Sequence, residues 1–165
     1  MGFRRLLFCE KGAAAAEMAL LTPIALLLLF TSFEAGHYMY QRHQVVKGLR
    51  DGARFAARHS FDDVNCRSGG FIDATLESEV KNLVRTGQIT GGSPRVSNWA
   101  DADITVSITC PTTAEATTGI YVTAEPAPQV NIIAYFKYDS LFNGLGVITN
   151  NASLGGAQQA TVMGI

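Results

Sequence analysis

Apolar residues are concentrated near the start of the chain, in a run without a polar face. From Ala13 to Phe33 the sequence AAAAEMALLTPIALLLLFTSF contains a single charged residue, Glu17. A run of about 20 apolar residues matches the hydrocarbon thickness of a bilayer. A surface helix of a soluble domain would instead show a polar face at a period of 3.6 residues. The pattern predicts a transmembrane helix over residues 13–33, preceded by a short N-terminal leader over residues 1–12.

The helix is expected to continue beyond this run. Apolar residues recur three and four residues apart between Val46 and Ala56, which indicates one buried helical face. The span and this extension together would form a helix of about 45 residues, on the order of 70 Å long. Residues 34–59 are therefore predicted to extend the span as the spine of a head formed by residues 60–165.

Two further patterns fall on the spine. Gly48 and Gly52 have a spacing that permits close approach of another helix, but we favour an accidental pair. A basic stripe lies about 100° from the apolar one and consists of Lys47, Arg50, Arg54 and Arg58. This stripe either meets acidic partners or anionic lipid head groups, or it is simply a solvated face.

The remainder of the chain reads as an α+β head. Apolar residues on one face predict a second helix over Phe71 to Arg85, with Gly87 as its C-terminal cap. Alternating or apolar patterns then predict strands: Asp103 to Cys110, Gly119 to Glu125, Val130 to Tyr138, and Ala152 to Met163. A helix followed by several strands favours a small antiparallel sheet packed on helices.

The cysteines suggest one covalent link. Cys110 falls on the inward face of its predicted strand, and Cys66 lies in the loop after the long helix. On the oxidising side of a membrane, they would close a loop of about 44 residues. The alternative is two buried free thiols. Cys9 precedes the span and would stay on the reducing side.

Composition excludes several functions. The formal net charge is −1, from 13 Lys and Arg against 14 Asp and Glu, whereas a nucleic-acid binder is usually basic. Three cysteines are too few for a four-cysteine zinc site. The histidines His37, His43 and His59 lack the i, i+4 spacing of a helical metal pair. No nucleotide-binding or hydrolase motif is present, so we expect no catalytic residue, metal or cofactor.

The start of the span carries a processing motif. Gly12 is followed by four alanines and then Glu17, which puts a carboxylate five residues beyond a glycine. This arrangement resembles the site at which prepilin peptidase cuts type IV pilins after glycine. The stretch KGAAAAEMALLTPIALLLLFTSFEAGHYMYQ resembles, more specifically, the N-terminus of TadE-like minor pilins, or pseudopilins, of the tight-adherence (Tad/Flp) secretion system. The matching positions are Gly12, Glu17, Pro23, Glu34 and Gly36.

The resemblance implies cleavage after Gly12 and assembly into a pilus. Cleavage would give Ala13 a new α-ammonium group, which could neutralise Glu17 of a neighbouring subunit in an apolar filament core. The implied partners are the inner membrane, prepilin peptidase, other pilin and pseudopilin subunits, and the Tad assembly platform. Met18 departs from the family, which usually has an aromatic residue there.

Several alternatives remain open. Glu17 could lie among lipid head groups without a role, and the kink expected at Pro23 is either a hinge for filament packing or a tolerated defect. Basic residues flank the span equally, so charge does not set its orientation. The pilin resemblance and the cysteines favour a cytoplasmic N-terminus in the bacterial inner membrane, with the head periplasmic or extracellular. The alternative functions are an uncleaved, single-pass anchored binding module and, less favoured, an anchored hydrolase.

Overall fold

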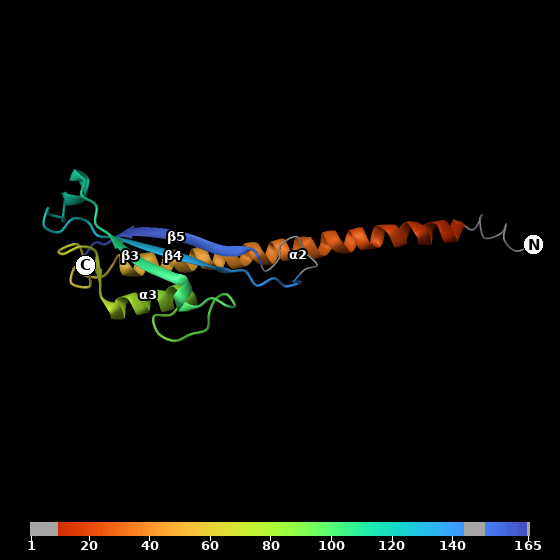
Figure 1. Ribbon diagram of the computed structural model, residues 1–165, viewed down its shortest axis with the longest axis horizontal. Helices are drawn as coiled ribbons and strands as arrows, with labels where there is room; N and C mark the ends of the chain where they lie inside the picture. The colour runs from red at the N-terminus through yellow and green to blue at the C-terminus, as the bar shows by residue number, and fades with distance from the viewer. Residues whose placement is uncertain (1–9, 144–150, 165) are drawn as a thin grey trace, which may run out of the picture.

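A single long helix runs through the molecule, and a head covers its C-terminal half (Figure 1). This computed structural model describes residues 10–143 and 151–164, so most of the predicted leader over residues 1–12 lies outside the described residues. The long helix, α2, spans Glu10–Ala56. The α+β class expected from the sequence is confirmed, because α2 is followed by a second helix and antiparallel sheets.

The second helix begins later than predicted. Helix α3 spans Ala74–Thr86, and Asp73 caps it by accepting hydrogen bonds from the backbone N–H groups of Thr75 and Leu76 at 2.8 and 3.2 Å. The two residues that we assigned to its start form strand β2 (Phe71–Ile72), which pairs with β1 (Val64–Asn65). An Asp immediately before the helical face is a stronger start signal than the apolar residues preceding it. Gly87 ends the helix in a left-handed conformation, as expected.

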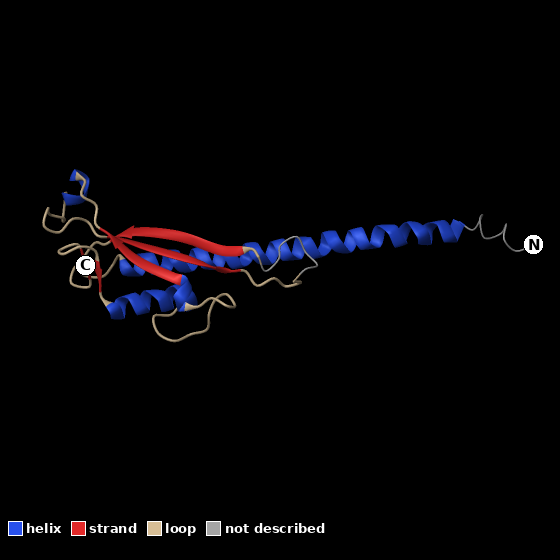
Figure 2. Ribbon diagram, viewed as in Figure 1, coloured by secondary structure: helices blue, strands red, loops and turns tan. Residues whose placement is uncertain are grey.

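The main sheet contains three antiparallel strands in the order β3-β4-β5. Strand β3 spans Ile104–Thr109, β4 spans Gln129–Lys137, and β5 spans Ser153–Thr161. In β4 alternate residues are buried, and β4 and β5 both contact α2. Helix α3 also contacts α2, and Figure 2 shows the head over the C-terminal half of α2, with the N-terminal half bare.

The strand predicted over residues 119–125 is wrong. This segment forms turns and one isolated bridge between Val122 and Glu125. Strand β4 has β3 and β5 on its two sides, and residues 119–125 pair with neither outer edge of this sheet. Ile120 and Val122 are accordingly exposed. Apolar content alone suggested a strand here, but a strand forms only where its backbone groups find a partner.

Helix α3 packs closely on α2 at the two glycines that we had interpreted as an accidental pair. A Cβ atom on Gly48 would lie 2.2 Å from the backbone oxygen of Val84, and one on Gly52 would lie 2.3 Å from the Val84 Cγ2 atom. Both glycines are buried, and α2 is in extensive contact with α3. The four-residue spacing therefore provides the surface on which α3 docks, and the accidental interpretation is wrong.

We expect Gly48→Ala to lower the free energy of unfolding by about 2 kcal/mol, because the added methyl group clashes with backbone that cannot move aside. Gly36→Ala is the matched control on the same helix. A Cβ on Gly36 meets nothing within 4 Å, so this substitution should stabilise the helix by about 0.5–1 kcal/mol. Thermal unfolding in detergent, followed by near-ultraviolet circular dichroism, measures both effects. Equal shifts for the two variants would contradict the close packing.

The disulfide expected between Cys66 and Cys110 is present, with their Cα atoms 5.7 Å apart. It links the segment between β1 and β2 to the end of β3. Gly70 also lies close to this strand, because a Cβ there would be 2.6 Å from the backbone oxygen of Ile108. The small β1-β2 sheet is thereby fastened to the main sheet.

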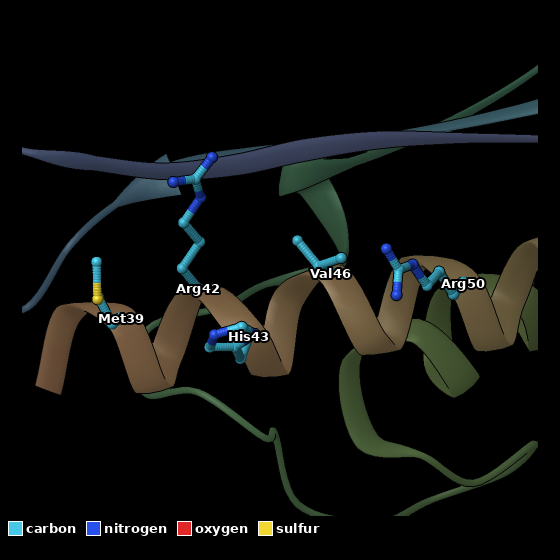
Figure 3. A pocket seen from close by; sticks show the side chains of 5 residues that line it. All are labelled: Met39, Arg42, His43, Val46 and Arg50. Atoms are coloured by element: carbon cyan, nitrogen blue, oxygen red, sulfur yellow. The ribbon is translucent and has the colours of Figure 1, made fainter. Parts of the chain in front are cut away.

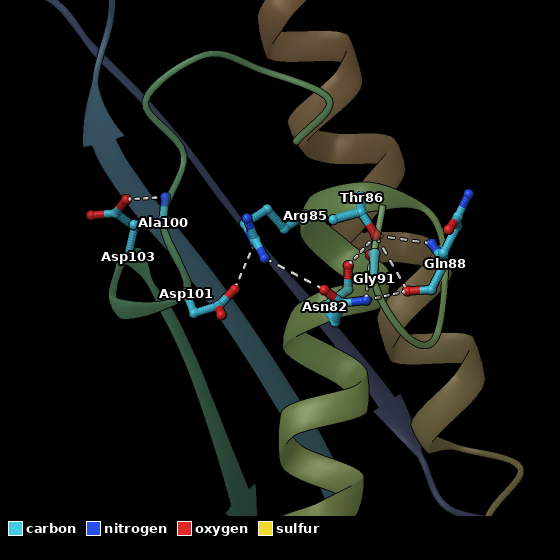
Figure 4. A network of polar contacts seen from close by, with 8 residues as sticks. All are labelled: Asn82, Arg85, Thr86, Gln88, Gly91, Ala100, Asp101 and Asp103. Carbon is cyan, nitrogen blue, oxygen red and sulfur yellow. Dashed lines mark hydrogen bonds and ion pairs between the residues drawn. The ribbon is translucent and has the colours of Figure 1, made fainter. Parts of the chain in front are cut away.

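A polar network fastens the segment between α3 and β3 (Figure 4). The Asn82 side-chain amide donates to the backbone oxygens of Gln88 and Gly91, both at 2.9 Å. Arg85 forms an ion pair with Asp101 at 2.6 Å, in the short 3-10 helix η1 (Asp101–Asp103). These contacts hold the segment that carries Trp99, whose ring is buried and stacks on Phe136 at a centroid distance of 5.4 Å.

Candidate functional site

The N-terminal half of α2 is an apolar surface with no cover from the head. Every residue from Gly12 to Leu29 is exposed, and Leu20 has 73% of its surface exposed. In the described part of the chain, this is the one helix long and apolar enough to cross a membrane. Exposed leucines at this density are unfavourable in water. The surface therefore requires either lipid or the apolar helices of other subunits.

Glu17 lies within this bare surface, close to its N-terminal end. It is exposed, and among the described residues no basic group forms an ion pair with it. Gly12 and Ala13 lie one turn earlier, also exposed, and a Cβ on Gly12 would meet nothing within 4 Å. The structure therefore leaves the motif residues accessible to other molecules. Cleavage after Gly12 and a counter-charge for Glu17 stay predictions.

Helix α2 continues through Pro23. The ring nitrogen carries no hydrogen, so one backbone hydrogen bond of the helix is missing at this point. The adjacent Thr22 hydroxyl donates to the backbone oxygen of Met18 at 2.6 Å, which supplies a local polar contact within the apolar surface. A role for Pro23 as a hinge stays a prediction.

A buried carboxylate marks the point where the head meets the bare half of the helix. Glu34 is fully buried. Its Oε1 atom accepts hydrogen bonds from the Tyr138 hydroxyl at 2.6 Å and the Leu141 backbone N–H at 3.2 Å, and its Oε2 atom accepts one from the Phe142 backbone N–H at 3.2 Å. The Glu34 side chain thus fixes the segment after β4 to α2.

A series of hydrogen bonds leads from Glu34 through Tyr138 and His37 to Gln41. The Tyr138 hydroxyl lies 3.0 Å from His37 Nδ1, and His37 Nε2 lies 3.2 Å from Gln41 Nε2. Because the Tyr138 hydroxyl donates its hydrogen bond to Glu34, its oxygen is free to accept one from His37 Nδ1–H, and His37 Nε2 then accepts from the Gln41 amide. With the Gln41 amide in this orientation, His37 donates through Nδ1 and accepts through Nε2.

The electrostatics of the network favour an ionised Glu34. Burial by itself raises the pKa of Glu34, but hydrogen bonds from Tyr138, Ser140 and the backbone N–H groups of Phe142 and Leu141 outweigh it and lower the pKa below its usual value. The pKa of Tyr138 is raised, first by burial and then by its hydrogen bond to Glu34. The phenol therefore stays protonated and remains a donor.

Glu34 is predicted from the sequence only as a position of the family resemblance, without its hydrogen-bond partners. An acidic residue at the end of an apolar run is a local signal that was available. Tyr138 gave no such signal, because it was part of a strand interpreted as core. His37 was considered for metal binding and excluded on spacing; it instead supports Tyr138.

Next to this junction, the free face of α2 carries a shallow basic hollow of about 300 Å³. Figure 3 shows Arg42 and Arg50 on this face with His43 and Val46 between them and Met39 beyond Arg42. Asp51, the acidic residue within this part of the helix, is held by Arg95 from the loop after α3 at 3.0 Å. The hollow is therefore suited to an anionic group.

The histidines and the neighbouring acids Asp101 and Asp103 lie in separate contacts within the described residues. No three His, Cys, Asp or Glu side chains there lie together as a possible metal site. His59 lies 3.3 Å from Asp63, His43 lines the basic hollow, and His37 belongs to the Glu34 network. The paired acids Asp101 and Asp103 are used separately, one by Arg85 and the other by the backbone N–H of Ala100 at 2.8 Å.

These features define a class of protein: an α+β head rigidly attached to a single helix that is a candidate membrane anchor. Residues 12–54 match the family model described as TadE-like protein, which confirms the resemblance seen in the sequence. The matched region coincides with almost all of α2, so the long helix of this chain is TadE-like. The TadE-like family is associated with the Tad pilus. No curated protein and no solved structure matches the chain.

Proposed function

We propose that this protein is a minor pilin or pseudopilin of a tight-adherence pilus, anchored in the bacterial inner membrane by α2. The observation that carries the proposal is the coincidence of the family match at residues 12–54 with the bare apolar half of the helix. Residues 13–33 cross the bilayer, residues 34–59 form the spine, and the head over residues 60–165 lies in the periplasm. The disulfide supports this orientation, because such bonds persist in oxidising compartments.

In this proposal, prepilin peptidase cuts between Gly12 and Ala13, and the assembly platform then moves the mature chain from the bilayer into the pilus. The apolar surfaces of neighbouring subunits replace lipid around α2. Within that packing, the Ala13 ammonium group of one subunit and the Glu17 carboxylate of another neutralise each other. A buried charge without this partner would be strongly unfavourable.

N-terminal sequencing of protein purified from membranes tests the proposal. A mature chain beginning at Ala13 supports processing by the peptidase, and a Gly12→Leu variant should keep its leader. An intact Met1 in cells with active peptidase would instead favour the uncleaved, single-pass anchored binding module. Recovery of the unprocessed chain as a monodisperse, detergent-free protein would contradict anchoring altogether.

Glu17→Ala is expected to block assembly without reducing membrane insertion. Removing the acid leaves the Ala13 ammonium group unpaired, at a cost of about 3 kcal/mol, or about a hundredfold in the equilibrium for adding a subunit. Insertion itself should improve slightly, because the apolar run then carries no charge. Immunoblots of sheared pili and of membranes measure the two steps separately.

Met18→Ala serves as the matched control, because Met18 is the exposed neighbour of Glu17 and carries no charge. It should assemble far better than Glu17→Ala. If the two variants assembled equally well, the charge-neutralisation step would be wrong.

A further inference from the structure

The segment that follows β4 returns to α2 at the edge of the bare helix surface. It leaves the sheet at Tyr138 and lies at the end of the head nearest the N-terminal half of α2 (Figure 1). Phe142 places its ring 5.0 Å from that of Phe30, measured between centroids. Phe30 is the first residue of α2, counted from the N-terminus, that the head partly covers.

These contacts fix the height of the segment along the helix. The backbone N–H groups of Leu141 and Phe142 both donate to the Glu34 carboxylate, so the segment cannot slide along α2. Glu34 comes 21 residues after Ala13, which corresponds to about 32 Å of helix. The hydrocarbon core of a bilayer is about 30 Å thick. With α2 spanning the membrane as proposed above, Leu141 and Phe142 lie at the bilayer surface.

The side chains level with Glu34 along the axis of α2 are suited to the membrane interface. Leu141 has 54% of its surface exposed, and Phe33 on the neighbouring turn of α2 has 60%. Exposed apolar and aromatic side chains gain free energy in the zone between acyl chains and head groups. The Glu34 charge at the same height is fully buried and accepts four hydrogen bonds, so it meets no lipid.

We propose that residues 139–143 form a second membrane contact, in which Leu141 and Phe142 insert into the interface of the leaflet on the head side. The occupant of this apolar surface is lipid. Glu34 is the positioning residue, because it holds the backbone of the segment against α2. A second contact beside the helix prevents the head from rotating and tilting freely above the bilayer. The inference rests on the proposed membrane anchor.

Spin labelling of the full chain in vesicles of phosphatidylethanolamine and phosphatidylglycerol tests this contact. In a Cys9→Ser background the disulfide occupies the other two cysteines, so Leu141→Cys provides the single labelling site. The label should collide with oxygen, which concentrates in lipid, several-fold more often relative to a water-soluble nickel chelate than a label at Tyr135→Cys. Tyr135 is the matched control, 69% exposed on the outer face of the sheet.

A third label, at Leu27→Cys in the predicted span, tests the membrane anchor separately from the second membrane contact. We call frequent collision with oxygen a lipid signal, and frequent collision with the nickel chelate a water signal. A lipid signal at both Leu27 and Leu141, with a water signal at Tyr135, supports the second contact. A lipid signal at Leu27 with a water signal at Leu141 would overturn it and leave the anchor intact. A water signal at Leu27 would overturn the anchor and the contact together. Adding Glu34→Gln to the Leu141→Cys protein should lower the lipid signal; an unchanged signal would remove the positioning role of Glu34.

Discussion

Glu34→Ala is expected to lower the free energy of unfolding of the head by about 3 kcal/mol. The substitution leaves the Tyr138 hydroxyl and the backbone N–H groups of Leu141 and Phe142 without their acceptor, and each such buried or part-buried donor costs about 1–3 kcal/mol. Partial opening of the segment lets water reach some of these donors, which keeps the total below the sum. Denaturant unfolding of the full chain in detergent measures the change.

Comparing the free energy of unfolding of the natural protein with that of Glu34→Gln across pH isolates the contribution of the Glu34 negative charge. Because the pKa of Glu34 is lowered in the folded chain, its contribution to stability is complete above the ordinary value of 4.5 and is lost as the pH falls through the lowered pKa. The stability difference between the natural protein and Glu34→Gln should therefore be constant near neutral pH and shrink in acid. A difference that grows in acid would show that Glu34 is not held as a carboxylate.

The paired substitution Cys66→Ser and Cys110→Ser is expected to lower stability by about 4 kcal/mol. The bond joins residues 44 apart, and in the chain-entropy model closing a loop of this length restricts the unfolded chain by that amount. The loss should exceed that of Glu34→Ala. It should also be reproduced in the natural protein by adding reductant before unfolding.

Cys9→Ser is the matched control for the thiol chemistry, because Cys9 lies outside the described residues and outside the disulfide. Its unfolding curve should follow that of the natural protein, with and without reductant. Labelling of thiols before and after reduction gives an independent check. Two thiols that label fully without reductant would exclude the disulfide.

Local pattern was sufficient to predict most of the fold. The apolar run and the three-and-four spacing after it predicted α2, and the alternation from Ile104 onward predicted β3. The apolar pattern over residues 130–138 predicted β4, which lies at the centre of the sheet. Each of these signals depends on residues within one element, which a sequence displays directly.

Apart from the disulfide between Cys66 and Cys110, contacts between residues far apart in the sequence were not predicted. The hydrogen bond between Glu34 and Tyr138 joins residues 104 positions apart. The sequence around either residue does not indicate the other as its partner. Gly48 was difficult to interpret for the same reason, because its role is to let Val84 of α3 approach α2 closely. Residues 119–125 show the reverse case, where local apolar content suggested a strand that the sheet does not include. Glu17 and the Gly12–Ala13 bond stay predictions, because their partners are other molecules.

Strand β5 has a consequence for the order of events during synthesis. It is the last strand among the described residues, yet it packs on α2, the first helix described, and the Met163 backbone N–H donates to the Ala57 oxygen at 3.0 Å. With α2 inserted in the membrane as proposed, the ribosome must therefore synthesise residues 153–161 before the sheet can close on a helix that has already left the ribosome. In that proposed arrangement, premature stop codons near residue 150 should leave an inserted α2 with an unfinished head, which proteases on the head side of the membrane would degrade.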